Sequence, residues 1–165
     1  PIADNGTVTL GSSGDTFTIA SGVTQTIAVN TPAFRATSSS GNTVPNQSYT
    51  KLTFDTEAFD TNNNFASSRF TPTVSGKYSI TAQTRLNSDS DFNDNIIAIY
   101  KNGSISSSRQ MSHLHYECNL VTGIIDMNGS SDYVEVYFFH NQGGNVATDG
   151  GTTLNFFEAY KLIGE

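Results

Sequence analysis

Apolar and polar residues alternate along most of this chain, and that pattern constrains the fold more than any other feature. Residues 78–82 read Tyr-Ser-Ile-Thr-Ala, and residues 132–138 read Asp-Tyr-Val-Glu-Val-Tyr-Phe. Successive side chains of a β-strand point to opposite faces, so a period of two is typical of strands that bury one face. No segment makes a convincing amphipathic helix. We therefore expect an all-β protein.

Turn signals divide the chain into about eight to ten strands. Asn102-Gly103 and Asn128-Gly129 each fit a two-residue hairpin turn, because type I′ turns need positive φ at both central positions. Residues 69–78 read Arg-Phe-Thr-Pro-Thr-Val-Ser-Gly-Lys-Tyr, which predicts a strand, a tight turn at Gly76 and a second strand. Residues 153–163 are expected to form a long closing strand. This number of strands indicates an antiparallel two-sheet jelly roll or a barrel.

Size and charge exclude several classes of protein. With 165 residues the chain can bury a core without metal or disulfide staples. Its net charge of −7, with eight basic residues, argues against nucleic-acid binding and against adhesion to anionic membranes. No apolar run approaches the ~18 residues of a membrane-spanning helix, so we expect no membrane insertion. The only cysteine, Cys118, excludes an internal disulfide and is expected to be a small buried residue on a strand.

The first 31 residues are predicted to form a segment distinct from the main domain of residues 32–165. Short alternating runs occur at residues 7–10, 16–19 and 26–29, and each is too short to bury a core of its own. We expect such a segment to pair with copies in other chains or to dock on the main domain. Residues 7–22 resemble the β-structured shaft and linker segments of bacteriophage fibre proteins, and an ordinary N-terminal β-meander is the alternative.

Several motifs of residues 32–165 resemble those of C1q-like domains, a family of trimer-forming jelly rolls without a catalytic centre. They are Pro-Ala-Phe-Arg-Ala at 32–36, the segment 69–78 quoted above, Tyr-Lys-Asn-Gly at 100–103, Asp-Tyr-Val-Glu-Val at 132–136, and Phe156-Phe157 on the last strand. The resemblance implies an all-β, antiparallel C1q/TNF-like jelly-roll sandwich that assembles as a homotrimer.

Two departures from the family pattern favour a phage or other microbial protein over an animal secreted one. No Gly-X-Y collagen run precedes the domain, and the β-rich segment of residues 1–31 stands there instead. The final strand reads Asn-Phe-Phe-Glu-Ala-Tyr over residues 155–160, where animal members often have Ser-x-Phe-x-Gly-Phe-Leu.

The aromatic residues of the last strands exceed what one small sandwich can bury. A contiguous apolar patch on a soluble protein usually marks an interface, and a closed threefold interface buries it on all three subunits. We expect Phe138, Phe156 and Tyr160 to contribute to that interface.

Two motifs predict metal ligands, although the fold requires no cofactor. His113 and His115 would share one face of a strand, and in some trimeric phage fibres a His-x-His pair from each chain binds one axial transition metal. Asp89, Asp91 and Asn93 have the spacing of the first ligands of a calcium loop. The alternatives are partly exposed strand histidines and a solvated loop, since Asp94 replaces the glycine and Tyr100 the glutamate that such a calcium loop needs.

The chain is expected to be a binding or structural protein and not an enzyme, because it lacks the usual nucleophile, phosphate-binding and zinc-protease motifs. We predict a trimeric virion protein, such as a tail fibre, head fibre or capsid decoration, which is anchored to other virion proteins through residues 1–31. It would display loops 38–45, 87–95 and 141–151 on the virion surface toward a host glycan or receptor. A secreted C1q/TNF-like ligand or lectin-like module of a cellular organism is the alternative, and a polysaccharide depolymerase is a more distant one.

Overall fold

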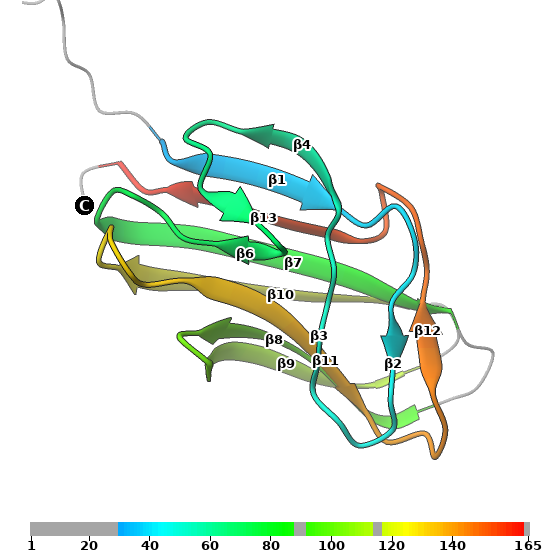
Figure 1. The fold of residues 1–165 in the computed structure, drawn as a ribbon. Helices are drawn as coiled ribbons and strands as arrows, with labels where there is room; N and C mark the ends of the chain where they lie inside the picture. The colour runs from blue at the N-terminus through cyan, green and yellow to red at the C-terminus, as the bar shows by residue number, and fades with distance from the viewer. Residues whose placement is uncertain (1–29, 88–91, 114–116, 164–165) are drawn as a thin grey trace, which may run out of the picture.

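The computed structural model describes residues 30–87, 92–113 and 117–163, and at residues 92, 93 and 113 it describes the backbone alone. Within these ranges the chain has thirteen strands and no helix, so the prediction of an all-β fold is confirmed (Figure 1). No helix long and apolar enough to cross a membrane occurs in the described ranges. The strands are β1 (Ala33–Thr37), β2 (Thr43–Val44), β3 (Thr50–Lys51), β4 (Thr56–Asp60), β5 (Phe65–Ala66), β6 (Arg69–Phe70), β7 (Gly76–Asn87), β8 (Phe92–Lys101), β9 (Ser104–His113), β10 (Cys118–Met127), β11 (Val134–His140), β12 (Val146–Thr148) and β13 (Phe156–Lys161).

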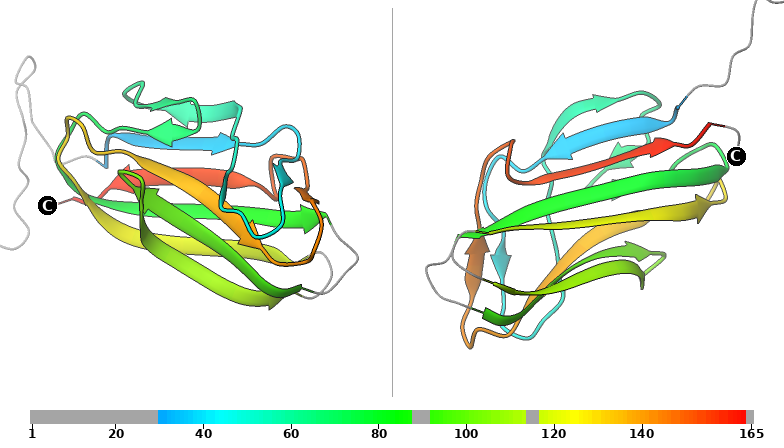
Figure 2. Two further views of the ribbon diagram at one scale, coloured as in Figure 1. Left: turned by 60° about the horizontal axis from the view of Figure 1, so that its bottom comes forward. Right: turned by 180° about the vertical axis from the view of Figure 1, so that it is seen from behind.

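Two antiparallel sheets pack face to face as a jelly-roll sandwich. In the first sheet β7 pairs with β10 on one side and with β13 and β12 on the other; β1 and β4 continue beyond β13, and β2 beyond β12. In the second, β11 pairs with β8 on one side and with β6 and β3 on the other, and β9 and β5 lie at its two ends. Seen from behind, β1, β13, β7 and β10 lie side by side (Figure 2, right).

The core consists of the inward side chains of both sheets, as the alternating pattern requires. β7 shows the pattern most clearly, because all five even-numbered residues from 78 to 86 are buried while the residues between them are half-buried. The Tyr78 hydroxyl donates a hydrogen bond to the Val74 carbonyl oxygen at 2.7 Å, which ties the turn before β7 to the core. Burial raises the pKa of the Tyr78 hydroxyl to about 12.

One predicted hairpin is confirmed and the other is wrong. Asn102 and Gly103 have φ values of 50° and 80° and join β8 to β9, as a type I′ turn requires. Asn128-Gly129 joins no hairpin, because β10 and β11 belong to different sheets. Asn128 Oδ1 accepts hydrogen bonds from the backbone amides of the three residues 130–132, so its side chain organises a longer connection between the sheets.

The structure also differs from the sequence-based expectations for the closing strand, for loop 141–151 and for Cys118. The closing strand, expected over residues 153–163, is limited to β13. Loop 141–151 contains β12, which pairs with β2 and β7. Cys118 is exposed at the start of β10 and not buried as expected, because it lies on the outer face of the sheet.

We expect the substitution Gly129→Ala to lower the free energy of unfolding by about 2 kcal/mol, through backbone strain and steric overlap together. Gly129 has a φ of 71°, and an added Cβ would lie 2.3 Å from the Ser75 amide nitrogen and 2.6 Å from the Val74 carbonyl carbon. Gly144→Ala is the matched control, because nothing lies within 4 Å of its added Cβ, and we expect a change below about 0.5 kcal/mol. Urea denaturation measures both, and equal effects of the two substitutions would contradict this account.

Candidate binding surfaces

The outer face of β1, β13, β7 and β10, which we call the β13 face, carries rows of cross-strand neighbours. Residues directly opposite each other in a sheet share one face. The strand register places Tyr160, Ser79 and Ile124 in one row. Phe156, Gln83 and Leu120 form a second row. Tyr160 is 44% exposed and Ile124 is 68% exposed, so this face presents large apolar groups to solvent.

Polar pairs occupy the middle of the β13 face. Arg35 forms an ion pair with Glu158, and its guanidinium carbon lies 4.2 Å from the centroid of the Phe156 ring. The hydroxyl oxygens of Thr81 and Thr122 are 3.4 Å apart. Since these groups already pair with one another, a partner that covers them leaves no unpaired charge buried.

The three residues predicted at an interface do not lie together. Phe156 and Tyr160 are both on the β13 face, where an interface remains a proposal. The expectation for Phe138 is wrong, because its side chain is 0% exposed and belongs to the core of its own protomer. On β11 the inward positions are 134, 136, 138 and 140, and the alternating residues Tyr137 and Phe139 point outward.

A cluster of four aromatic side chains lies on the outer face of the second sheet, on the opposite side of the sandwich. We call it the tyrosine face, and it consists of Tyr49, Tyr100, Tyr137 and Phe139. The ring centroid of Tyr49 is 5.0 Å from that of Phe139 and 5.9 Å from that of Tyr100, and Tyr100 is 4.2 Å from Tyr137. Tyr49 is 37% exposed and the other three are half-buried.

A buried carboxylate anchors one end of the tyrosine face. The Glu135 side chain is 4% exposed, and its Oε1 accepts hydrogen bonds from Lys51 Nζ at 2.6 Å and Arg69 Nε at 2.9 Å. Burial raises the pKa of Glu135, but the bonds and charges of Lys51 and Arg69 outweigh it, so the pKa is below its usual value. The Tyr137 hydroxyl donates to Glu135 Oε2 at 3.2 Å, which fixes the ring in place.

Burial also acts on the tyrosines of this face. It raises the pKa of the Tyr100 hydroxyl, and the neighbouring Tyr49 adds to the effect. Burial raises the pKa of Tyr137 as well, and the charge of Glu135 contributes in the same direction. These hydroxyls therefore stay protonated and can donate hydrogen bonds at neutral pH.

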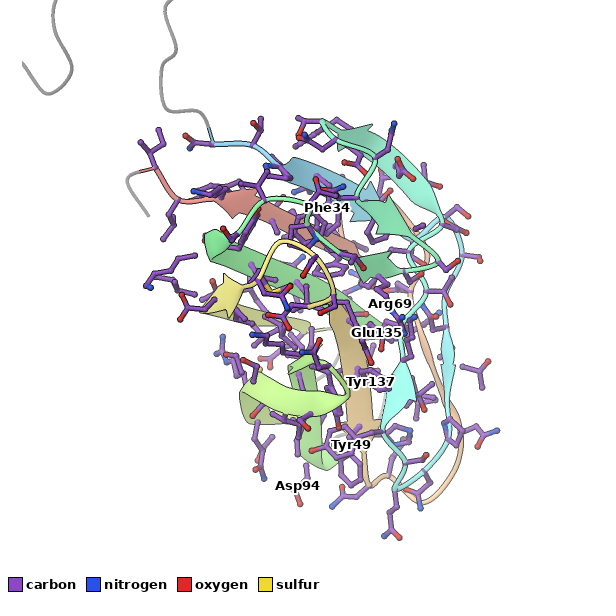
Figure 3. The ribbon with its side chains drawn as sticks, turned by 60° about the vertical axis from the view of Figure 1, so that its left-hand side comes forward. Phe34, Tyr49, Arg69, Asp94, Glu135 and Tyr137 are labelled. Atoms are coloured by element: carbon purple, nitrogen blue, oxygen red, sulfur yellow. The ribbon has the colours of Figure 1, made fainter. Side chains whose placement is uncertain are left out.

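Amide and carboxylate groups border the other end of the tyrosine face. Asp94 Oδ1 accepts a hydrogen bond from Gln110 Nε2 at 2.5 Å, and Asp94 Oδ2 accepts one from Asn141 Nδ2 at 3.0 Å. The backbone amide of Asp94 donates to Asn141 Oδ1 at 3.1 Å. Arg69, Glu135, Tyr137, Tyr49 and Asp94 thus follow one another along the sandwich (Figure 3).

The predicted metal ligands fall on parts of the chain that the structure leaves out. Asp89, Asp91 and His115 lie outside the described residues, and the side chains of Asn93 and His113 are not described. Among the residues that are described, no group of three or more His, Cys, Asp or Glu side chains could hold a metal ion. The two metal sites therefore stay predictions.

Sequence reasoning missed the tyrosine face, although a signal for it exists. Residues 133, 135, 137 and 139 are Tyr, Glu, Tyr and Phe, and they alternate with buried residues along β11. Large aromatic groups on the outward side of a strand depart from the usual alternation of apolar inside and polar outside. The residues from the neighbouring strands, Tyr49 and Tyr100, become part of the cluster only through strand pairing.

Comparisons with known proteins support the fold class. No protein-family model matches this sequence, and no curated protein matches it significantly. A crystal structure of murine APRIL at pH 5.0 superimposes with a TM-score of 0.62 at 11% identity, covering 79% of this chain and 98% of the other. A second, at pH 8.0, gives 0.53 at 9% identity with the same coverage. The globular domain of zebrafish complement 1qA protein aligns over 79% of this chain and 97% of its own length, at 16% identity and a TM-score of 0.46. The likeness to APRIL shows that this chain shares the C1q/TNF-like jelly-roll fold. At this identity the likeness concerns the fold alone.

Proposed function

We propose that this chain is the non-enzymatic, homotrimeric head of a virion appendage, such as a tail fibre, head fibre or capsid decoration, and that it attaches the particle to a host surface or glycan. The trimer and the phage setting rest on the resemblance of the sequence to C1q-like domains and of residues 7–22 to fibre segments. Residues 1–31 would join the head to other virion proteins, and the head would stand at the virion surface, outside the cell.

The observation that carries the proposal is the apolar surface of the β13 face. Among the described residues Ile124 is the most exposed large apolar side chain, Tyr160 is 44% exposed, and the two lie in one row across β13, β7 and β10. Exposed apolar groups gathered on one sheet face usually mark an interface. In a closed threefold assembly each subunit buries the same surface, so three copies of every loop point outward together. Three weak contacts to a repetitive surface then act as one strong attachment.

A single charge placed on the β13 face is expected to dissociate the trimer. Burying an aspartate that has no partner costs several kcal/mol, and this cost would arise in each subunit of the trimer. Light scattering of the wild-type protein should give about three times the chain mass of 17.7 kDa, and Ile124→Asp should give the mass of a single chain.

Ile105→Asp is the matched control, because Ile105 is 48% exposed but lies on β9 of the other sheet. This variant should remain a trimer. A monomeric wild-type protein would contradict the proposal, and dissociation caused by Ile105→Asp alone would move the interface away from the β13 face.

Metal binding is part of the same proposal and is tested by the same measurement of mass in solution. Calcium at Asp89, Asp91 and Asn93, or a transition metal at His113 and His115 on the threefold axis, would link subunits or stabilise loops. A trimer that loses mass in the presence of a chelator would support a metal at one of these sites. A trimer that is unchanged in mass and in thermal stability would argue against both.

The fold also favours a second candidate, a secreted C1q/TNF-like ligand or lectin-like module of a cellular organism. Murine APRIL shares the jelly roll over 79% of this chain. The full-length gene separates the two candidates. A virion-attachment segment within a cluster of phage genes supports the first, and a signal peptide with a collagen run supports the second.

A further inference from the structure

We propose that the tyrosine face is a binding site for a neutral glycan chain, which stacks its sugar rings on Tyr49 and the neighbouring aromatic side chains. This proposal rests on the proposed attachment function, and it names the site and the chemical class of the ligand. The site lies on the sheet formed by β3, β11 and β8, whereas the expected attachment positions were loops 38–45, 87–95 and 141–151.

The position of the tyrosine face keeps it accessible in the proposed trimer. Its residues point outward from the second sheet, while the β13 face is the outer side of the first sheet. The two faces therefore lie on opposite sides of one sandwich, with the core between them. If the β13 face is covered by other subunits, the tyrosine face remains exposed in three copies.

The shape and chemistry of the cluster suit a pyranose ring. An aromatic ring carries partial negative charge on its face, which attracts the partly positive C–H groups on the apolar side of a sugar. The chain of contacts from Phe139 through Tyr49 and Tyr100 to Tyr137 has centroid separations of 4.2–5.9 Å. Neighbouring rings are tilted by 34–61° against one another, so the exposed ring of Tyr49 offers the main stacking surface and the other rings border it.

The Tyr137 end of the cluster is held in place before any ligand binds. Tyr137 is fixed by its hydrogen bond to Glu135, and Glu135 is fixed by Lys51 and Arg69. Lys51 Nζ also donates to the Ser67 carbonyl oxygen at 3.0 Å. Because these side chains are already ordered, binding loses little further conformational entropy.

Polar groups stand where sugar hydroxyls would reach them. Asp94 on β8 and Asn141, which directly follows β11, lie two residues beyond Ile96 and Phe139, about 7 Å along the chain. Each Asp94 oxygen accepts one hydrogen bond from the protein, and a carboxylate oxygen has two lone pairs. Asp94 can therefore accept further hydrogen bonds from hydroxyl groups of a sugar stacked on Phe139 and Tyr49.

The charges of the site favour a neutral ligand over an anionic one. Lys51 and Arg69 share the single negative charge of Glu135, and Asp94 offsets the positive charge that remains, so the charges of the site cancel. Asp94 adds a negative charge at the far end, and the whole chain has a net charge of −7. An anionic sugar stacked on Phe139 and Tyr49 would lie near the Asp94 carboxylate, and repulsion would lower its affinity.

The test uses the full-length trimer and a panel of immobilised oligosaccharides. The panel contains neutral chains of glucose, galactose and N-acetylglucosamine, with sialylated and sulfated chains as the anionic set. We expect binding to at least one neutral chain, and at least a tenfold loss of affinity in Tyr49→Ala, measured by calorimetry on that chain. Tyr49→Phe keeps the stacking surface and should bind within about twofold of wild type, because it removes only a hydroxyl group.

The variants also separate the site from the fold and from the attachment function. Tyr49→Ala should keep the trimer mass and the thermal midpoint of wild type, and Asp94→Asn should weaken binding without removing the stacking. Wild-type affinity of Tyr49→Ala for the bound chain would overturn the inference while leaving the attachment function intact. Binding only to anionic chains would overturn the ligand class. If no glycan binds, the inference fails, and binding of the labelled trimer to intact bacterial cells then decides the attachment function separately.

Discussion

Replacing Lys51 and Arg69 together with methionine is expected to lower the free energy of unfolding by about 3 kcal/mol at pH 7, because the Glu135 charge then stays buried without a cation. The Glu135 side chain is 4% exposed, whereas the Lys51 and Arg69 side chains are 32% and 44% exposed. Removing the carboxylate by Glu135→Gln leaves two cations that water can solvate. We expect this control to cost less, about 1–2 kcal/mol.

The effect of the double substitution must depend on pH in a defined direction. In wild type the pKa of Glu135 in the folded state is lowered, so its ion pairs contribute stability above the unfolded-state pKa, and this contribution is lost as the pH falls through the folded-state pKa. In the double variant only burial remains as a strong influence, and it raises the pKa of Glu135. The difference in stability between wild type and variant is therefore largest near pH 7 and smallest near pH 3.

Urea denaturation at pH 3, 5 and 7, at one fixed protein concentration, measures this dependence. The concentration is held constant because dissociation of an oligomer would add to the apparent stability. A difference between wild type and variant that stays constant from pH 7 to pH 3 would show that Lys51 and Arg69 act through packing of their alkyl chains and not through the charge of Glu135.

The fold class was predictable from the sequence because strand formation and core burial leave the same period-two pattern. β7, β8 and β11 are long enough for that pattern to be clear, and Asn102-Gly103 joins β8 to β9 by local turn chemistry alone. Asn128-Gly129 has the same composition, but it can form a hairpin only if β10 and β11 pair in the same sheet. β10 instead pairs with β7, and those strands are far apart in the sequence, so local turn chemistry does not determine the connection.

The sequence could not tell which side of each strand faces the core. Phe138 and Phe139 are adjacent and chemically equal, but Phe138 is 0% exposed in the core and Phe139 belongs to the tyrosine face. A shift of one residue in strand register would exchange them. The same argument holds for Phe156, which is half-buried on the β13 face beside the fully buried Phe157. The interface prediction is therefore wrong for Phe138, and for Phe156 and Tyr160 it stays a prediction.

The substitution Phe34→Ala is expected to lower the free energy of unfolding by about 4 kcal/mol, because it removes the central ring of the aromatic core. Phe34 is 0% exposed, and its ring centroid lies 4.5 Å from Phe70, 4.7 Å from Phe65 and 4.9 Å from Phe157. Phe34 and Phe157 belong to paired strands of the first sheet, and Phe65 and Phe70 to the second. The cavity left by alanine would remove contacts between the two sheets, which the surrounding strands cannot close by small movements.

Phe59→Ala is the matched control, because Phe59 lies on β4 beside β1 but is 50% exposed. We expect a loss below about 1 kcal/mol for this variant. Calorimetric melting of both variants at one concentration should show a decrease of the midpoint by about 10 °C or more for Phe34→Ala and only a few degrees for Phe59→Ala. Similar decreases for both would mean that the stability of the sandwich does not depend on this aromatic cluster. A large decrease of the melting midpoint for Phe34→Ala alone would show that the aromatic side chain at position 34, next to the start of β1, holds the two sheets together.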